Sequence, residues 1–266
     1  MNYKNYFGFQ KEPFAQDIRI QDLYPLPGLE ALVERFMFAV QLCAVTVITG
    51  DVGSGKSTFL RYACSKLHPS EYKILSVLAN TGTVLEMNRQ ILLSLAQESN
   101  ANSITRVVRT IRSLVLDIAA RRERPLLVID EAHLVRLEVF AQLHVLAQFE
   151  FDSKPVLPIV LSGQNNLIDK LLYHTSRPLA SRVVGKSHLE GLTLKDMTGY
   201  LHHHLEIAGI KERVFSEDAV VAIHQGSGGL LRRANILARG GLVAAASEKC
   251  SQVTAEHVRI ASTEII

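Results

Sequence analysis

Hydrophobic positions along the chain predict an alternation of strands and helices up to about residue 190. Apolar runs typical of strands buried on both faces of a parallel sheet occur at 44–49, 73–78, 125–130 and 155–163. Apolar residues spaced for one face of a helix predict helices at 56–67, within 80–97, and at 104–122 and 134–149. This βαβ alternation predicts an α/β fold with a parallel sheet sandwiched by helices.

The pattern changes after about residue 190, because only helical periodicities follow. The expected helices span 193–207, 216–225, 230–248 and 254–262. Ser216 and Thr254 stand where helix N-caps are expected. We therefore expect two domains: residues 1–190, with an aromatic N-terminal arm, and a small all-helical domain at 191–266.

Composition narrows the class of protein without choosing a function. With 47% hydrophobic and 21% charged residues in 266, the chain is too apolar to be disordered. Its net charge of +3 permits a polyanionic partner without demanding one. Cys43, Cys64 and Cys250 lie far apart, which argues against a disulfide framework or a zinc site. Because no signal peptide precedes the fold and no apolar run approaches roughly 18 residues, we expect a cytoplasmic protein.

The segment GDVGSGKS, residues 50–57, lies between a predicted strand and a predicted helix. It fits G-x-x-x-x-G-K-[ST], in which glycines let successive backbone N–H groups point into one concavity at a helix N-terminus. Lys56 is then placed to reach the β- and γ-phosphates of ATP, and the Ser57 hydroxyl to ligate Mg²⁺. The residues expected to contact the nucleotide are Gly50, Asp51, Val52, Gly53, Ser54, Gly55, Lys56, Ser57 and Thr58.

Two carboxylates, Asp130 and Glu131, follow the buried run LLVI within LLVIDEAH. Beside a phosphate-binding loop, the first carboxylate is expected to hold Mg²⁺, directly or through water. The second is expected to orient and polarise the attacking water. The pair therefore predicts a Mg²⁺-dependent ATPase rather than a protein that only binds ATP.

These motifs and their spacing resemble the AAA+ ATPases. They are more narrowly similar to the ExeA-like group, whose relatives include transposition ATPases such as TnsC and phage Mu B. The resemblance covers nearly the whole chain and starts at YFGFQKEPF, residues 6–14, similar to the group's Y-F-G-[LF]-x-x-x-P-F opening. In AAA+ proteins this segment lies near the adenine, although a hydrophobic arm packed on the core explains the same aromatic residues. The resemblance implies a P-loop AAA+ core followed by a helical lid.

Two further matches imply a sensor and an arginine finger. PIVLSGQNNLI is similar to the group's strand followed by V-G-Q-x-x-L, which implies Gln164 as the sensor-1 residue and Ser162 as the alternative. In SRPLASRVVGKSHLEGL, the group's [QS]-R-[IV] pattern implies Arg182 as the finger, with Arg177 second. An arginine finger acts in trans on charge that develops at a neighbouring subunit's γ-phosphate.

The lid carries the last match. GSGGLLRRANIL resembles G-G-x-P-R-x-[IL]-N-x-L and implies Arg232 as the sensor-2 arginine that contacts the nucleotide. Leu231 stands where the group usually has proline, so Arg233 remains an alternative. With one arginine on the lid and another at an interface, ATP binding is expected to favour a ring or helical filament, which hydrolysis releases.

Three functions remain open at this stage. The first is a transposition regulator that assembles on double-stranded DNA and delivers a transposase, without membrane insertion. The second is an ExeA-like secretion or pilus-assembly ATPase; such proteins often continue into a spanning helix and a peptidoglycan-binding domain, whereas this sequence stops at Ile266. The third is a non-enzymatic adaptor, against which Glu131 counts.

Basic residues favour the DNA-binding alternative. Arg106, Arg109 and Arg112 are spaced to share one helix face, which fits either a phosphate backbone or solvent. Further basic residues follow at Arg121, Arg122 and Arg124, and residues 80–87 offer another DNA-binding loop. The consecutive His202, His203 and His204 point in different directions on a helix, so they predict a polar helix face rather than a metal site. His133 is expected to cap or to lie at an interface.

Overall fold

The computed structural model describes residues 2–263 and divides the chain into two compact units. The α/β unit comprises Glu30–Asp51 and Lys56–Leu189. The helical unit comprises the described residues up to Leu29, Val52–Gly55, and those from Glu190 onwards. The N-terminal arm thus groups with the helical unit, which differs from the expectation that assigned it to the first domain.

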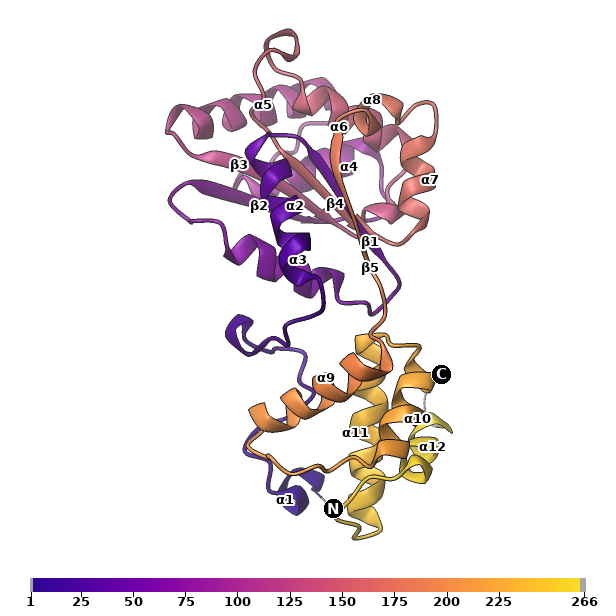
Figure 1. The fold of residues 1–266 in the computed structure, drawn as a ribbon. Helices are drawn as coiled ribbons and strands as arrows, with labels where there is room; N and C mark the ends of the chain where they lie inside the picture. Colours follow the sequence, from indigo (N-terminus) through magenta and orange to yellow (C-terminus); the bar gives the residue numbers. More distant parts are fainter. Residues whose placement is uncertain (1, 264–266) are drawn as a thin grey trace. The chain divides into compact units, whose positions relative to one another are not determined.

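The α/β unit contains a five-stranded parallel sheet in the order β2-β3-β4-β1-β5 (Figure 1). Its strands are β1 (Val45–Gly50), β2 (Tyr72–Leu78), β3 (Arg124–Asp130), β4 (Ile159–Gly163) and β5 (Val183–Leu189). The predicted α/β fold with a parallel sheet is confirmed. β4 starts later than the predicted strand at 155–163 because Pro155 and Pro158 lack the N–H group that a ladder needs.

Helices cover both faces of this sheet. Alternate residues of each strand point to opposite sides, so each face presents side chains that a helix can bury. Val45, Ile159 and Leu127 lie in register and share a core with α4 (Val84–Ser94), α5 (Ile104–Ala120) and α6 (Leu137–Ala147). On the other face lie α2 (Leu29–Gln41) and α3 (Lys56–Ser65), where Phe36 and Phe59 meet edge to face with ring centroids 6.4 Å apart. The sheet is therefore the middle layer of three.

Local capping explains where the predicted helices begin. The Thr83 hydroxyl accepts from the Glu86 N–H and the Glu86 carboxylate accepts from the Thr83 N–H, a capping box that starts α4. The predicted helix at 134–149 is shorter, because a 3₁₀ turn, η2 (Ala132–Leu134), precedes α6, and η3 (Glu150–Asp152) follows it. The pattern analysis did not predict α2, α7 (Asn166–Leu172) or α8 (Arg177–Ala180).

The helical unit is built from four longer helices near their predicted positions. They are α9 (Leu194–Ile207), α10 (Glu217–Ser227), α11 (Leu231–Ser247) and α12 (Ala255–Thr263). The arm, with α1 (Tyr3–Phe7) and η1 (Ile20–Asp22), contributes to the core of this unit through Phe9 and Phe14, which pack with Met197 and Leu205. Phe9 and Phe14 are therefore core residues of the helical unit, and Tyr3 and Phe7 pack against that core while partly buried.

The prediction of one polar face for the three consecutive histidines is wrong for His204. That ring is buried against Phe14 and Tyr200, and its Nδ1 donates to the Pro13 carbonyl at 2.7 Å. The His203 ring instead reaches the Asp22 carbonyl, and His202 lies 3.6 Å from Glu206. Burial lowers the pKa of His204 to about 4, so its ring is neutral at neutral pH.

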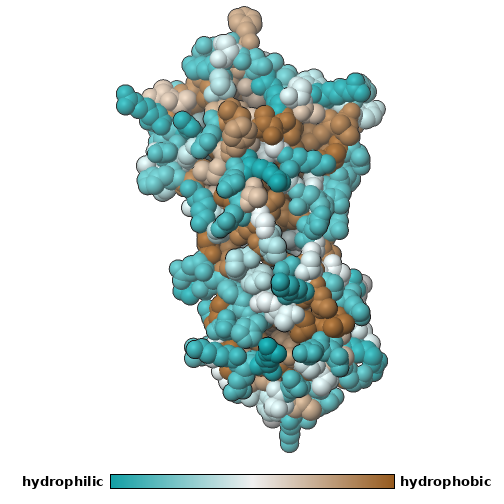
Figure 2. Space-filling model, viewed as in Figure 1, coloured by the Kyte–Doolittle hydropathy of each residue, from teal (hydrophilic) through white to brown (hydrophobic). Residues whose placement is uncertain are grey.

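On the face shown in Figure 2 most of the surface of either unit is hydrophilic, with smaller hydrophobic areas between. Exposed apolar side chains include Phe38 and Leu42, one turn apart at the end of α2. No helix within residues 2–263 combines the length and the apolar character needed to cross a bilayer.

Candidate nucleotide-binding site

The predicted site residues of the α/β unit gather where parallel strands end. Gly50 ends β1, Asp130 ends β3, and Gln164 directly follows β4. Because these strands run parallel and are neighbours in the sheet, their carboxyl ends lie at one edge, the usual location of ligand sites in such sheets. The fold therefore brings together the phosphate loop, the two carboxylates and the predicted sensor.

The backbone of the phosphate loop adopts the conformation that its glycines permit. Gly53 and Gly55 have φ values of 85° and 98°, which residues with a Cβ rarely adopt. Lys56, 6% exposed, donates from Nζ to the carbonyls of Gly50 at 2.9 Å and Asp51 at 2.8 Å. The buried Ser54 hydroxyl has no hydrogen-bond partner among the described residues. The Lys56 ammonium is thus held at the end of β1 by two backbone carbonyls.

Ser57 and Asp130 meet although they lie on different elements. The Ser57 hydroxyl in the first turn of α3 donates to Asp130 Oδ2 at 2.7 Å, and the other carboxylate oxygen accepts from the Glu131 N–H at 2.9 Å. Oxygen ligands of an octahedral Mg²⁺ lie about 3 Å apart, given bonds of about 2.0–2.1 Å. The spacing and chemistry of this oxygen pair therefore fit adjacent positions on a magnesium ion.

Glu131 contacts a buried histidine. Its backbone has a φ of 56°, and its carboxylate Oε2 lies 3.3 Å from Nδ1 of His133 on η2. The same Nδ1 lies 3.4 Å from the backbone N–H of Gln164. Burial lowers the pKa of His133 although the Glu131 carboxylate raises it, so the ring is neutral at neutral pH.

Two further contacts, which the sequence analysis did not predict, tie this edge of the sheet together. Lys170 of α7 donates from Nζ to the carbonyls of His133 and Val135, which fixes η2 to the helix after β4. The Asn165 side chain donates to Asp51 Oδ1 at 3.3 Å. No sequence pattern signalled these pairs, since each depends on the pairing of β4 with its neighbours.

Comparison with known proteins identifies the segment that carries this geometry. Residues 40–171 match the model of the family described as AAA domain. The chain is also 27% identical over 269 residues to the general secretion pathway protein A of Aeromonas hydrophila. That alignment covers 99% of this chain and 48% of the relative, so the chain spans about half the length of the curated relative it matches.

Solved structures share the fold over more of the chain than the matched segment. Cdc6p from Pyrobaculum aerophilum superimposes with a TM-score of 0.73 at 16% identity, covering 96% of this chain and 70% of that chain. The Aeropyrum pernix ORC1 protein, solved in complex with DNA, has a TM-score of 0.71 at 16% identity, covering 97% and 70%. The predicted AAA+ P-loop fold is confirmed. The narrower resemblance to TnsC and Mu B stays a prediction.

The predicted finger, Arg182, lies away from the carboxyl end of β1, where the phosphate loop begins. It directly precedes β5, and its carbonyl accepts from the N–H of Val45 at the start of β1, whereas the phosphate loop follows the end of β1. Its guanidinium donates to Asp152 and, at 3.1 Å, to His144 Nδ1. Arg177, the alternative, is exposed in the first turn of α8.

The predicted sensor-2 residue, Arg232, is exposed in the first turn of α11. Its backbone N–H donates to the Gly53 carbonyl at 3.2 Å, and both residues belong to the helical unit. A Cβ on Gly53 would lie 2.8 Å from the Arg232 Cβ, so a larger residue at position 53 would force this contact apart. The adjacent Arg233 is also exposed.

The basic residues of α5 do not act as one set. Arg106 and Arg109 are exposed. Arg112 instead donates to the Val145 carbonyl at 2.8 Å and stacks over the Phe149 ring, 4.4 Å from its centroid. Arg112 is therefore a packing residue, which corrects the expectation of a continuous basic face. Among the others, Arg121 and Arg122 are exposed, and Arg124 lies over Tyr72.

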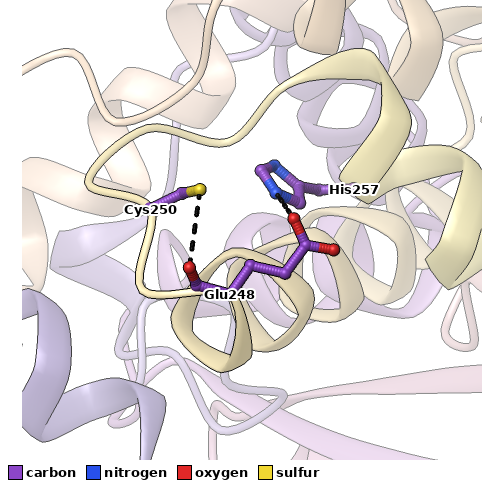
Figure 3. A group of neighbouring side chains, drawn as sticks. All are labelled: Glu248, Cys250 and His257. Atoms are coloured by element: carbon purple, nitrogen blue, oxygen red, sulfur yellow. Dashed lines mark hydrogen bonds and ion pairs between the residues drawn. The ribbon is translucent and has the colours of Figure 1, made fainter.

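A second cluster lies in the helical unit, where Glu248, Cys250 and His257 offer ligand atoms within 4.8 Å of one another (Figure 3). His257 Nδ1 accepts from the Thr254 N–H at 2.9 Å, so Nε2 carries the ring proton and donates to Glu248 at 3.1 Å. The Cys250 thiol faces the Glu248 carbonyl at 3.8 Å. Both ring nitrogens are thus engaged, and the cluster links the end of α11 to the start of α12.

Proposed function

We propose that this chain is a Mg²⁺-dependent ATPase that assembles on double-stranded DNA in its ATP-bound form and regulates transposition by recruiting a transposase. The observation that carries the catalytic part is the contact between Ser57 and Asp130 at 2.7 Å, beside the buried Lys56. An oxygen pair next to a lysine-bearing phosphate loop is the donor set that Mg²⁺ and a triphosphate require.

Each residue has a separate role in this proposal. Gly50–Thr58 would hold the phosphates through backbone N–H groups and the Lys56 ammonium, and Ser57 and Asp130 would hold the metal. A metal held there would supply positive charge to neutralise the phosphate oxygens. Glu131 would polarise the attacking water and Gln164 would contact the γ-phosphate from the end of β4. Arg232 is the proposed sensor-2 arginine of the helical unit.

The position of Arg182 supports assembly. It lies at the opposite end of the strands from the phosphate loop of its own α/β unit, which supports a role at a neighbouring copy's nucleotide. ATP then favours a homo-oligomer, because the γ-phosphate binds groups from more than one subunit. Exposed apolar residues such as Phe38 and Leu42 supply surface for such contacts.

DNA binding is supported by exposed basic residues and by one structural neighbour. Arg106 and Arg109 of α5 are available to phosphates, and the chain carries a net charge of +3. The Aeropyrum pernix ORC1 protein, which shares the fold, was solved in complex with DNA. We extend this to target selection and transposase delivery because the motifs resemble those of TnsC and Mu B.

A second candidate is a secretion ATPase that does not bind DNA. It is favoured by the similarity to general secretion pathway protein A, which extends over 99% of this chain. Both candidates share the same nucleotide chemistry, so DNA binding is the property that separates them.

The deciding experiment is fluorescence-anisotropy titration of duplex DNA with a slowly hydrolysed ATP analogue, with ADP, and without nucleotide, at several salt concentrations. We expect binding only with the ATP analogue, with a steep salt dependence and with ordered assemblies in negative-stain images. Lys56→Ala is expected to abolish nucleotide binding and, with it, DNA binding. If the analogue drives assembly but no DNA binds at any salt concentration, the DNA-binding function is refuted and the secretion candidate takes its place.

A further inference from the structure

Nδ1 of His133 faces two groups with opposite hydrogen-bonding needs. The Glu131 carboxylate, 3.3 Å away, can only accept a hydrogen bond, whereas the Gln164 N–H, 3.4 Å away, can only donate one. A neutral imidazole carries its proton on Nδ1 or on Nε2. With the proton on Nδ1 the ring bonds Glu131, and with the proton on Nε2 it accepts from Gln164. The two bonds therefore exclude each other.

The ring itself is fixed, so the change of partner does not need the ring to move. His133 is 7% exposed, and Lys170 anchors its carbonyl. A Cβ on Gly163 would lie 3.0 Å from the His133 backbone nitrogen and 3.3 Å from Nδ1, which shows how closely the turn packs against the end of β4. Glycine at position 163 is what permits this approach.

Glu131, by contrast, needs an external group to orient it. Its backbone lies in the left-handed region with a φ of 56°, and its side chain is 37% exposed. A flexible carboxylate in water is a poor general base, because only one of its many orientations faces the attacking water. The contact with His133 uses Oε2, so Oε1 can accept from that water.

We propose that His133 is a positioning residue that relays the position of the Gln164 backbone to the Glu131 carboxylate. This inference rests on the proposed ATPase function. When the segment after β4 shifts towards nucleotide, the Gln164 N–H leaves Nδ1, the ring proton moves to Nδ1, and Glu131 becomes oriented for hydrolysis. When the segment returns, Nδ1 accepts a hydrogen bond from the Gln164 N–H. Nδ1 then carries no proton to donate to the Glu131 carboxylate, so Glu131 is released.

The first test compares His133→Asn with His133→Gln. The asparagine amide nitrogen occupies the place of Nδ1, whereas the glutamine amide lies one carbon further out. We expect His133→Gln to lower kcat about 10- to 100-fold, with the dissociation constant for the ATP analogue within about twofold of wild type. His133→Asn should recover most of this loss. In a Glu131→Gln background, His133→Gln should cause no further loss, because its effect acts through that carboxylate.

The second test reads the tautomer directly, by ¹⁵N NMR of the His133 imidazole in the wild-type chain with ADP and with the ATP analogue. We expect the population protonated on Nδ1 to rise with the analogue. The inference is overturned by the same tautomer in both states, by an unchanged kcat of His133→Gln, or by losses that add in the double variant. If Glu131→Gln hydrolyses ATP as fast as the wild-type chain, the result refutes instead the proposed function on which the inference rests.

Discussion

A single buried side chain, His204, makes the stability of the helical unit depend on pH. Its pKa is about 4 in the folded chain against 6.5 for an unperturbed histidine. The unfolded chain therefore binds a proton first as the pH falls, and the protonated ring cannot stay buried between Phe14 and Tyr200. The stabilisation is fully present above pH 6.5, and about 3 kcal/mol of it is lost on the way down to pH 4.

We expect denaturant titrations between pH 7 and pH 4 to show this loss in the wild type and a shallower loss in His204→Leu. The substitution also removes the bond to the Pro13 carbonyl, so the pH dependence, rather than the absolute stability, is the quantity to compare. His202→Gln is the matched control, because that ring is not buried and should leave the wild-type pH profile unchanged. Equal slopes in His204→Leu and wild type contradict the prediction.

At the residue scale, the sequence predicted those site residues whose chemistry is local. Lys56 and Ser57 lie in one continuous motif, and Asp130 with Glu131 ends one apolar run. His133 follows two positions later, yet its contacts could not be derived. They depend on the left-handed turn at Glu131 and on how closely Gly163 of β4 approaches η2. Distances across strands are set by tertiary packing, which periodicity does not encode.

The α5 helix shows that one row of arginines serves two purposes. Replacing the exposed Arg106 and Arg109 by alanine should weaken DNA binding for every sequence and reduce the salt slope by about 2, because each arginine neutralises one phosphate. Arg112→Ala should instead lower the melting temperature, since it removes the bond to Val145 and the cation–π interaction with Phe149. Salt-dependent anisotropy and thermal melting of the same variants measure both effects.

The matched comparison within α5 is what makes this prediction specific. All three substitutions remove one positive charge each, so a non-specific effect of net charge would lower DNA affinity by the same factor at every position. The prediction fails if Arg112→Ala weakens DNA binding as much as Arg106→Ala does, with unchanged stability.

At the element scale, the hydrophobic pattern predicted four of the five strands and most of the longer helices, but neither β5 (Val183–Leu189) nor the 13-residue α2 nor the shorter α7 and α8. β1 and β3 are continuous apolar runs, and the α4 capping box stands in the sequence at Thr83 and Glu86. By contrast, α8 has only 4 residues and was missed. The turn η3 depends on left-handed residues such as Phe151, with a φ of 55°, which no local signal predicts.

At the scale of the whole molecule, the sequence analysis placed the N-terminal arm in the first domain, whereas the arm groups with the helical unit. An aromatic segment is equally able to pack on either core, and only the tertiary contacts of Phe9 and Phe14 decide. The order of strands in the sheet was likewise not derivable from periodicity, because β1 lies between β4 and β5, strands more than 100 residues later in the chain.

The trans role of Arg182 leads to a test on mixed assemblies. Arg182→Ala and Glu131→Gln should each be inactive alone, because every interface then lacks either the finger or the general base. In an equimolar mixture, about one quarter of interfaces pair an intact Glu131 with a neighbour's intact Arg182, if subunits assemble at random. We therefore expect ATPase activity of about one quarter of wild type.

Arg177→Ala mixed with Glu131→Gln is the control, since Arg177 is the alternative finger. The bonds from Arg182 to Asp152 and His144 must open before Arg182 can reach a neighbour's nucleotide. Assembled Asp152→Asn chains should therefore hydrolyse ATP faster than assembled wild-type chains. A mixture of Arg182→Ala and Glu131→Gln that stays inactive while it assembles would show that Arg182 does not act on a neighbour's nucleotide.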